Sequence, residues 1–193
     1  MPRDIWGLAA SAYFVASRLT YVLFVGTALQ RQDRDERYTR TLGAVEAFRR
    51  FRRTASLIMN NDGFAFILLC VVTRNTLFLP VSINVSLIAG AVLVVIGVGI
   101  KVWAARTLGS AAYYWHNFFD PESTPSPVST GPYRFFSNPM YTVGYLHTYG
   151  LALMLRSLPG LIGAAFAQAA ILSFYLIVEK PHFERLHRES PPS

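Results

Sequence analysis

The chain has little of what builds a disulfide-linked, metal-binding or soluble protein. It contains one cysteine in 193 residues, so no disulfide can form within the chain, and we expect Cys70 to be a small core residue. Neither a Cys/His spacing typical of a metal site nor a phosphate-binding loop of the soluble type is present, so no metal is predicted. Charged residues make up only 15% of the chain against 52% hydrophobic residues. This composition argues against a soluble protein of this size.

Negative charge is also scarce, with 11 Asp and Glu against 18 Lys and Arg, a formal net charge of +7. Such a basic balance can indicate nucleic acid binding. Here, however, the basic residues lie between long apolar runs, a pattern typical of membrane topology and of contact with anionic lipid headgroups. We therefore expect the lipid bilayer as a partner and no nucleic acid.

Five apolar runs come close to the length that crosses a bilayer. They cover residues 5–29, 57–79, 81–105, 140–155 and 158–178. The sequence thus predicts an all-α fold, a polytopic transmembrane helical bundle of about five spans. We expect one integral membrane domain, residues 1–193, in which residues 1–80 supply the N-terminal spans and a basic loop.

Arginines set the expected orientation of these spans. Eight of them fall within residues 30–56, which places that loop in the cytoplasm, the N-terminus outside and the C-terminus inside. A solvated basic connector is the expected structure there, with an interfacial helix over residues 43–53 as the alternative. Arg18 lies inside the first run, where a charge costs about 2.5 to 3.5 kcal/mol. We expect it to snorkel or to form a structural pair rather than to contact substrate.

The stretch from Gly131 to Gly150 reads GPYRFFSNPMYTVGYLHTYG, a polar turn that runs into an apolar segment. We expect Asn138 to cap a helix whose first residue is Pro139, because proline has no N–H to leave unpaired at that position. The remaining N–H groups at such a helix start would attract a carboxylate or phosphate. A capped transmembrane helix without a ligand is the alternative.

Two more features lie near the cytoplasmic end of the third run. Gly97 and Gly99 form a lone GxG, whose default meaning inside a membrane helix is close packing of small residues. Tyr113, Tyr114 and Trp115 have the composition of an interfacial aromatic belt.

A cytoplasmic pocket is expected where these segments converge. Glu179 follows the last run directly, and Tyr133, Tyr141 and His116 would lie near the expected helix start at Asn138. A pocket with both charge signs suits a zwitterionic, partly cationic ligand such as S-adenosylmethionine, and also other metabolites. For Glu179 alone, a solvated helix end is the alternative.

Two segments, GPYRFFSNPMY and VEKPHFERLHR, flank the last two apolar runs. Together they resemble the membrane methyltransferases that include phosphatidylethanolamine N-methyltransferases and isoprenylcysteine carboxyl methyltransferases. The resemblance covers about residues 90–188. The spelling NPMY, the GxG at 97–99 and the pair Leu108-Gly109 favour the phospholipid branch. The paired acids of the family become Glu179-Lys180-Pro181 here, so only Glu179 carries over as a cofactor-binding acid.

The resemblance implies that residues 81–193 form the catalytic core, with a cofactor pocket in the C-terminal half. It implies methyl transfer from S-adenosylmethionine to a membrane lipid headgroup amine, that of phosphatidylethanolamine or its methylated forms. The cofactor-binding residues expected on this basis are Gly97, Gly99, Tyr133, Asn138, Pro139, Met140, Tyr141 and Glu179.

The amine must be neutral to attack a methyl group, so a base or a dry pocket is needed. His147 is one candidate base, because helical spacing would put it on one face with Met140, Gly144 and Leu151. His116 is the other. Carboxyl methylation of isoprenylated cysteine, and a non-enzymatic lipid-binding protein of the same fold, are the alternative functions. The sequence sets neither the acceptor lipid nor an oligomeric state.

Overall fold

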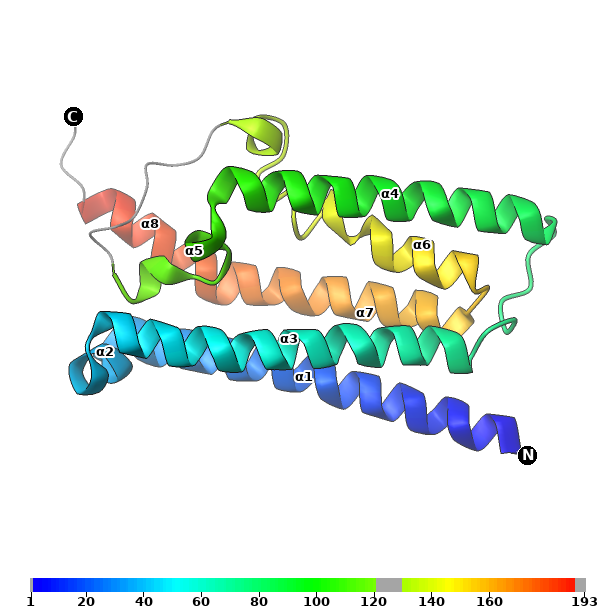
Figure 1. The fold of residues 1–193 in the computed structure, drawn as a ribbon, viewed down its shortest axis with the longest axis horizontal. Helices are drawn as coiled ribbons and strands as arrows, with labels where there is room; N and C mark the ends of the chain where they lie inside the picture. The colour runs from blue at the N-terminus through cyan, green and yellow to red at the C-terminus, as the bar shows by residue number, and fades with distance from the viewer. Residues whose placement is uncertain (1, 121–129, 190–193) are drawn as a thin grey trace.

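The computed structural model describes residues 2–120 and 130–189, and every regular element within them is a helix (Figure 1). Four helical stretches are long and apolar enough to cross a membrane, namely Ile5–Asp35, Ala44–Val72, Ile83–Leu108 and Leu158–Leu186. The first three belong to α1 (Pro2–Asp35), α3 (Ala44–Val72) and α4 (Ile83–Leu108). The fourth runs through α7 (Leu158–Phe174), a π-helical turn (Tyr175–Glu179) and into α8 (Lys180–Glu189). The predicted all-α bundle is confirmed.

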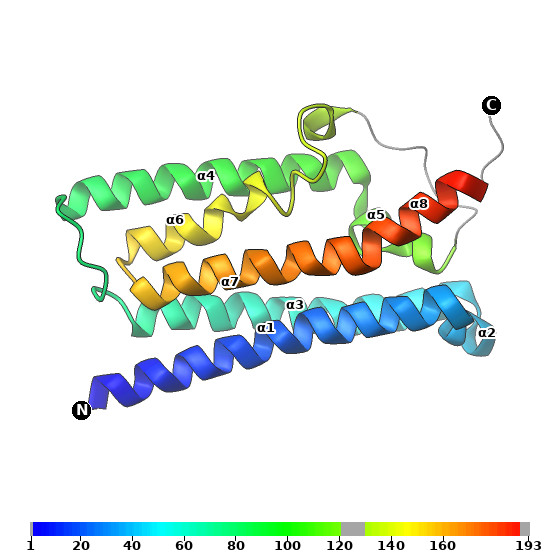
Figure 2. The ribbon, with the colours of Figure 1, turned by 180° about the vertical axis from the view of Figure 1, so that it is seen from behind.

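Two helix pairs and a central helix build the bundle. Helix α1 lies along α3, and α4 lies along the short helix α6 (Leu146–Met154), while α7 packs between the pairs (Figures 1 and 2). The beginning of α1 and the end of α8 lie at opposite ends of the bundle (Figure 1). Helices α2 (Arg37–Leu42) and α5 (Ser110–Tyr113) lie at the same end as α8.

The basic segment 30–56 is helical, so its prediction as a solvated connector is wrong. Helix α1 continues to Asp35, α2 follows, and α3 begins at Ala44. The reason lies in three residues at helical spacing, Ala47, Phe51 and Ala55, which are buried while the arginines between them face outward. This part of α3 therefore has a packing face of its own.

A buried ion pair joins α1 to α3. Arg18 Nη2 lies 2.5 Å from Asp62 Oδ2, and both side chains are almost fully buried. Beside this pair, Tyr13 donates to Asn61 Oδ1 at 2.7 Å, and Asn61 Nδ2 donates to Ser17 Oγ at 2.8 Å. The structural pair predicted for Arg18 is thus confirmed. Its partner Asp62 lies within the second span, and α3 begins thirteen residues earlier than the apolar run suggests.

The fourth apolar run forms a helix only in its second half. Tyr141 N does donate to Asn138 Oδ1 at 3.2 Å, as expected of a cap. However, residues 139–142 form turns, a 3₁₀ turn follows at Val143–Tyr145, and α6 begins only at Leu146. Gly144 N bonds Pro139 O instead of continuing a regular helix. The predicted helix start at Pro139 is therefore wrong, and so is the anion site expected from its dipole.

Glycines let α6 lie directly against α4. A Cβ on Gly90 would lie 2.6 Å from Gly150 O, and a Cβ on Gly150 would lie 2.5 Å from Gly90 O. Neither position can carry a side chain without moving the helices apart, which is how small residues act at membrane helix contacts. Since α6 covers only part of α4 (Figure 1), the rest of α4 faces the irregular segment before α6.

Candidate active site

A cavity of about 360 Å³ lies between α1, α3, α4, α5 and the segment that leads into α6. Its walls carry charged and polar side chains, among them Arg18, Asp62, Lys101, Tyr113, Tyr145 and His147. The cavity thus takes residues from the first two spans as well as from the C-terminal half. The sequence placed the pocket in the C-terminal half alone, because the resemblance covers only that part of the chain.

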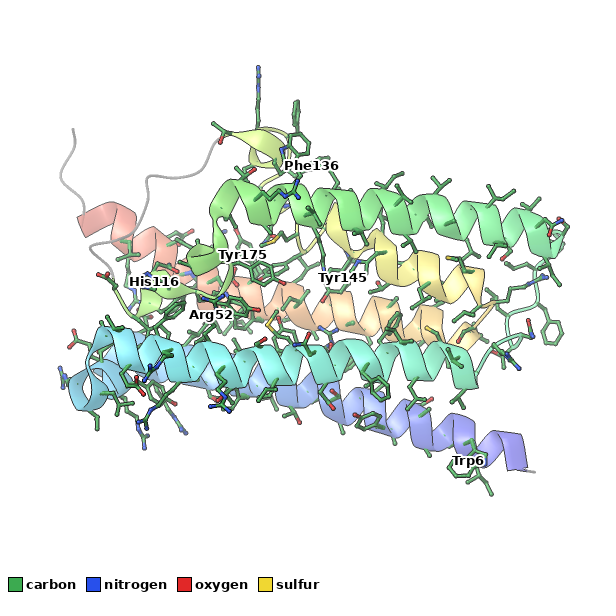
Figure 3. The ribbon with its side chains drawn as sticks, viewed as in Figure 1. Trp6, Arg52, His116, Phe136, Tyr145 and Tyr175 are labelled. Atoms are coloured by element: carbon green, nitrogen blue, oxygen red, sulfur yellow. The ribbon has the colours of Figure 1, made fainter. Side chains whose placement is uncertain are left out.

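Tyr145 holds the charged groups of the cavity together. Its hydroxyl accepts a hydrogen bond of 3.1 Å from Arg18 Nη1, and Lys101 Nζ lies 4.9 Å from the centroid of its ring. Figure 3 shows Tyr145 in the space between α3 and α4. A tyrosine can stabilise two cations in this way because its face is electronegative and its oxygen accepts.

One ring nitrogen of His147 has a described hydrogen-bond partner. Its Nδ1 lies 2.5 Å from Gly144 O, and because a carbonyl can only accept, Nδ1 must carry the proton and donate it. The neutral ring then has its lone pair on Nε2. His147 lines the cavity together with Met140 and Leu151, the two residues that the sequence placed beside it. The three residues do not share one face of an α-helix, however, because Met140 lies in a turn.

His116 lies elsewhere. It begins the 3₁₀ turn His116–Phe118, and its ring packs edge-on against Phe48 with 4.5 Å between centroids. It is not among the residues that line the cavity, and Figure 3 places it toward the end of the bundle that carries α2 and α8. Of the two candidate bases, the structure brings only His147 to the cavity.

Glu179 is a buried carboxylate directly behind the cavity wall. Its Oε1 accepts a hydrogen bond of 2.6 Å from the Tyr141 hydroxyl and another from Trp115 Nε1, and both donors line the cavity. Glu179 closes the π-helical turn, and such turns are found frequently at functional sites. The next residue, Lys180, faces outward and pairs with Glu184 at 3.8 Å. Lys180 occupies the position where the family that this chain resembles has its second acid. Its side chain therefore points away from the site.

The aromatic cluster 113–115, predicted as an interfacial belt, lies at the cavity. Tyr113, Tyr114 and Trp115 all line the cavity, and Trp115 is 5% exposed. Trp115 also has a left-handed backbone, with φ of +58°, which is uncommon for a residue other than glycine. Its ring packs edge-on against Phe174 of α7. Its indole N–H donates to Glu179 Oε1.

Tyr133 and Pro139 lie outside the cavity. Tyr133 lies in the 3₁₀ turn Gly131–Arg134, which sits against the end of α4, since a Cβ on Gly131 would lie 2.6 Å from Thr107 Oγ1. Burial raises the pKa of Tyr133, and the nearby Glu179 carboxylate raises it further. Pro139 is fully buried. Neither Tyr133, Pro139 nor the capping residue Asn138 lines the cavity itself.

The two glycines of the GxG have different surroundings. A Cβ on Gly97 would collide with His147 N and would lie 3.0 Å from Gly144 O, so Gly97 lets α4 approach the backbone that positions His147. A Cβ on Gly99 would meet nothing within 4 Å. The structure thus gives Gly97 a packing role beside the site and gives Gly99 no contact there.

Fold and cavity define an integral membrane protein with a buried polar site. Residues 85–190 match the family model described as phospholipid methyltransferase, and the chain belongs to this family. Proteins named phosphatidylethanolamine N-methyltransferase are similar to it: that of Clavispora lusitaniae is 31% identical over 73% of this chain, and that of Aspergillus fumigatus 33% identical over 74%. The chain spans only 17% and 16% of those two relatives. No solved structure matches the chain.

Asp62, Lys101 and Tyr145 are among the cavity residues that the sequence did not predict as site residues. The signal that could have found the first two is a charge inside an apolar run, since such residues face protein or water and mark functional positions by default. Tyr145 carries no comparable signal, because tyrosines are also common in membrane helices at the interface.

Proposed function

We propose that the chain transfers a methyl group from S-adenosylmethionine to the headgroup amine of phosphatidylethanolamine or of its methylated forms. The observation that carries this proposal is the joint position of His147 and Tyr141. They line one cavity in a chain of the phospholipid methyltransferase family, and Tyr141 is bonded to the buried Glu179. A base and a cofactor-type carboxylate thus serve the same enclosed space.

The residues present fit S-adenosylmethionine. A cavity of about 360 Å³ falls within the usual range for small-ligand sites. Five tyrosines line it, and aromatic faces attract a cation such as a sulfonium. They are Tyr21, Tyr113, Tyr114, Tyr141 and Tyr145. When bound, the cofactor supplies an electrophilic methyl group.

Cofactor binding is assigned to the Glu179 side of the cavity. Both hydrogen bonds described for Glu179 end on Oε1. We assign Oε2 to hydroxyl or amine groups of the ligand, which would reach it between Tyr141 and Trp115, because Glu179 itself lies behind the cavity wall. Tyr141 and Met140 would contact the ligand from the cavity wall. Tyr133, Asn138 and Pro139 would act as positioning residues, since they hold the segment on which Met140 and Tyr141 lie. Gly97 acts in the same way on His147, and the structure offers Gly99 no role in binding.

We assign His147 as the base that removes the proton of the amine. A lipid amine is protonated in water, and its lone pair becomes a nucleophile only after that proton leaves. Because Gly144 O holds the proton on Nδ1, Nε2 is the atom that accepts the proton of the amine. Burial of the reacting groups between helices excludes the water that would otherwise hydrate the amine.

A bilayer lipid can reach the cavity from the side of the bundle. Asn60, Gly63 and Ile67 line the cavity and are exposed on the surface of α3. We place the end of the bundle that carries α2 and α8 in the cytoplasm, with the start of α1 on the other side. The arginines of α2 and of the first turns of α3 support this orientation.

The test is a transfer assay with the full chain in lipid nanodiscs. Methyl-labelled S-adenosylmethionine should label phosphatidylethanolamine, and the label should survive mild alkali because an N-methyl group is not hydrolysed. A label that alkali releases would mark a carboxyl methyl ester and the alternative acceptor, isoprenylated cysteine. Binding of lipid without any transfer would mark a non-enzymatic protein.

A further inference from the structure

The cavity contains more positive than negative charge. Arg18, Lys101 and Asp62 are the charged residues that line it, two cations against one carboxylate. Arg18 pairs with one oxygen of this carboxylate, Asp62 Oδ2, at 2.5 Å. Glu179 lies behind the wall with its Oε1 held by Tyr141 and Trp115, so it does not compensate Lys101 from inside the cavity.

Lys101 is the cation left over. Within residues 2–120 and 130–189 it forms no ion pair within 4.0 Å, and its described contact is with the face of Tyr145. A cation–π contact alone stabilises an ammonium by only about 0.5 to 2 kcal/mol. An ionised group inside a membrane protein is normally paired, or it marks the path or site of a charged ligand. An anion is therefore the expected partner of Lys101.

We propose that Lys101 binds the phosphate of the acceptor phospholipid, and that this contact is what selects a phospholipid amine over other membrane amines. The inference rests on the proposed function, because it assigns the acceptor side of the same cavity. Lys101 and His147 line one cavity, so a headgroup phosphate held by Lys101 brings the amine of the same headgroup toward His147. A lysine suits this task, since its ammonium acts as a point charge toward phosphate.

The geometry of the walls agrees with this assignment. The exposed α3 residues Asn60 and Gly63 lie on one side of the cavity and Lys101 on the α4 side. A lipid that enters beside α3 meets Lys101 and Tyr145 inside, while Tyr141 and Glu179 remain for the cofactor. Arg18 is tied to Asp62 and Tyr145, so its own charge is already paired.

The experiment compares Lys101→Met, Lys101→Arg and the control Lys180→Met in nanodiscs. Lys180 is the other lysine of the chain and lies on the surface. Two acceptors are used: phosphatidylethanolamine, and hexadecylamine, which has no phosphate. Lys101→Met should raise the KM for phosphatidylethanolamine about tenfold or more, the usual effect of losing a hydrogen bond to a charged group. The KM for hexadecylamine and the affinity for S-adenosylmethionine should stay within about twofold, and Lys101→Arg should restore most of the loss.

A binding measurement keeps the inference separate from the proposed function. Phosphorus NMR of dihexanoyl phosphatidylethanolamine should show a shifted, broadened signal with wild-type protein and with Lys180→Met, but not with Lys101→Met. This result would support the phosphate contact even if no methyl transfer occurred, in which case the proposed function alone would fail. A Lys101→Met variant that binds the lipid normally would overturn the inference. So would a loss of S-adenosylmethionine affinity instead of lipid affinity, because Lys101 would then serve the cofactor carboxylate.

Discussion

Tyr141 donates a hydrogen bond of 2.6 Å to the Glu179 carboxylate, although 38 residues separate them in the chain. The bond joins the NPMY segment before α6 to the π-helical turn after α7. The two segments that carry the family resemblance thus meet at one carboxylate, and Trp115 adds a third segment through its bond to the same oxygen.

Glu179→Gln should weaken S-adenosylmethionine binding about tenfold or more, because a neutral amide replaces the carboxylate proposed to bind the cofactor. The fold should survive, since the glutamine Oε1 can still accept from Tyr141 and Trp115. Calorimetry in detergent measures the affinity. Lys180→Gln is the matched control, as Lys180 is the adjacent residue and faces outward. Equal affinities in Glu179→Gln and wild type would remove Glu179 from the cofactor site.

His147→Gln should lower kcat on the order of a hundredfold, the smaller end of the usual effect of a general base. The amide can keep a hydrogen bond to Gly144 O, but it offers no basic nitrogen. His116→Gln should change kcat far less, because its ring packs against Phe48 outside the cavity. A rate assay over a range of pH separates the two. If His116→Gln gave the larger loss, the base would have been assigned to the wrong histidine.

Breaking the Arg18–Asp62 pair should destabilise the protein strongly. Each single variant, Arg18→Met or Asp62→Leu, leaves one buried charge without its partner, which typically costs about 3 to 5 kcal/mol. The double variant should recover most of this stability, because both charges are then absent. Thermal unfolding in detergent, followed by circular dichroism, measures the difference. Additive losses in the double variant would show that the two residues do not stabilise each other.

Gly97→Ala and Gly99→Ala should differ sharply, although the two residues belong to one GxG. A methyl group at Gly97 would collide with the backbone of His147, and overpacking of this kind costs about 1 to 3 kcal/mol. Gly99 has open space, so its variant should retain wild-type stability and S-adenosylmethionine affinity. Unfolding temperatures and calorimetry check both. A loss of cofactor affinity in Gly99→Ala would restore the cofactor-binding role that the family resemblance implies.

Hydropathy and charge predicted most of the bundle, because long apolar runs and their basic flanks reflect a bilayer directly. They did not predict the interrupted run before α6. Residues 140–155 form an apolar run, but Gly144 bonds back to Pro139 and a helix begins only at Leu146. At this break Gly97 of α4 lies close to the backbone of Gly144 and His147, a contact between distant segments that no local pattern records.

The candidate site could be predicted where it rests on motifs. Glu179, Met140 and Tyr141 are at or beside the cavity as the resemblance implies. Asp62 and Lys101 lie outside those motifs, and their meeting near Arg18 depends on how α1, α3 and α4 pack. The π-helical turn that buries Glu179 is likewise a tertiary effect, since residues 175–179 read as an ordinary apolar helix end.

The most direct test of the account is an experimental density map of the full chain with S-adenosylhomocysteine and phosphatidylethanolamine. We predict cofactor density against Tyr141 and Glu179, the lipid phosphate beside Lys101, and the lipid nitrogen facing His147. Density for either molecule outside the cavity, for instance along the open side of Gly99, would contradict the account.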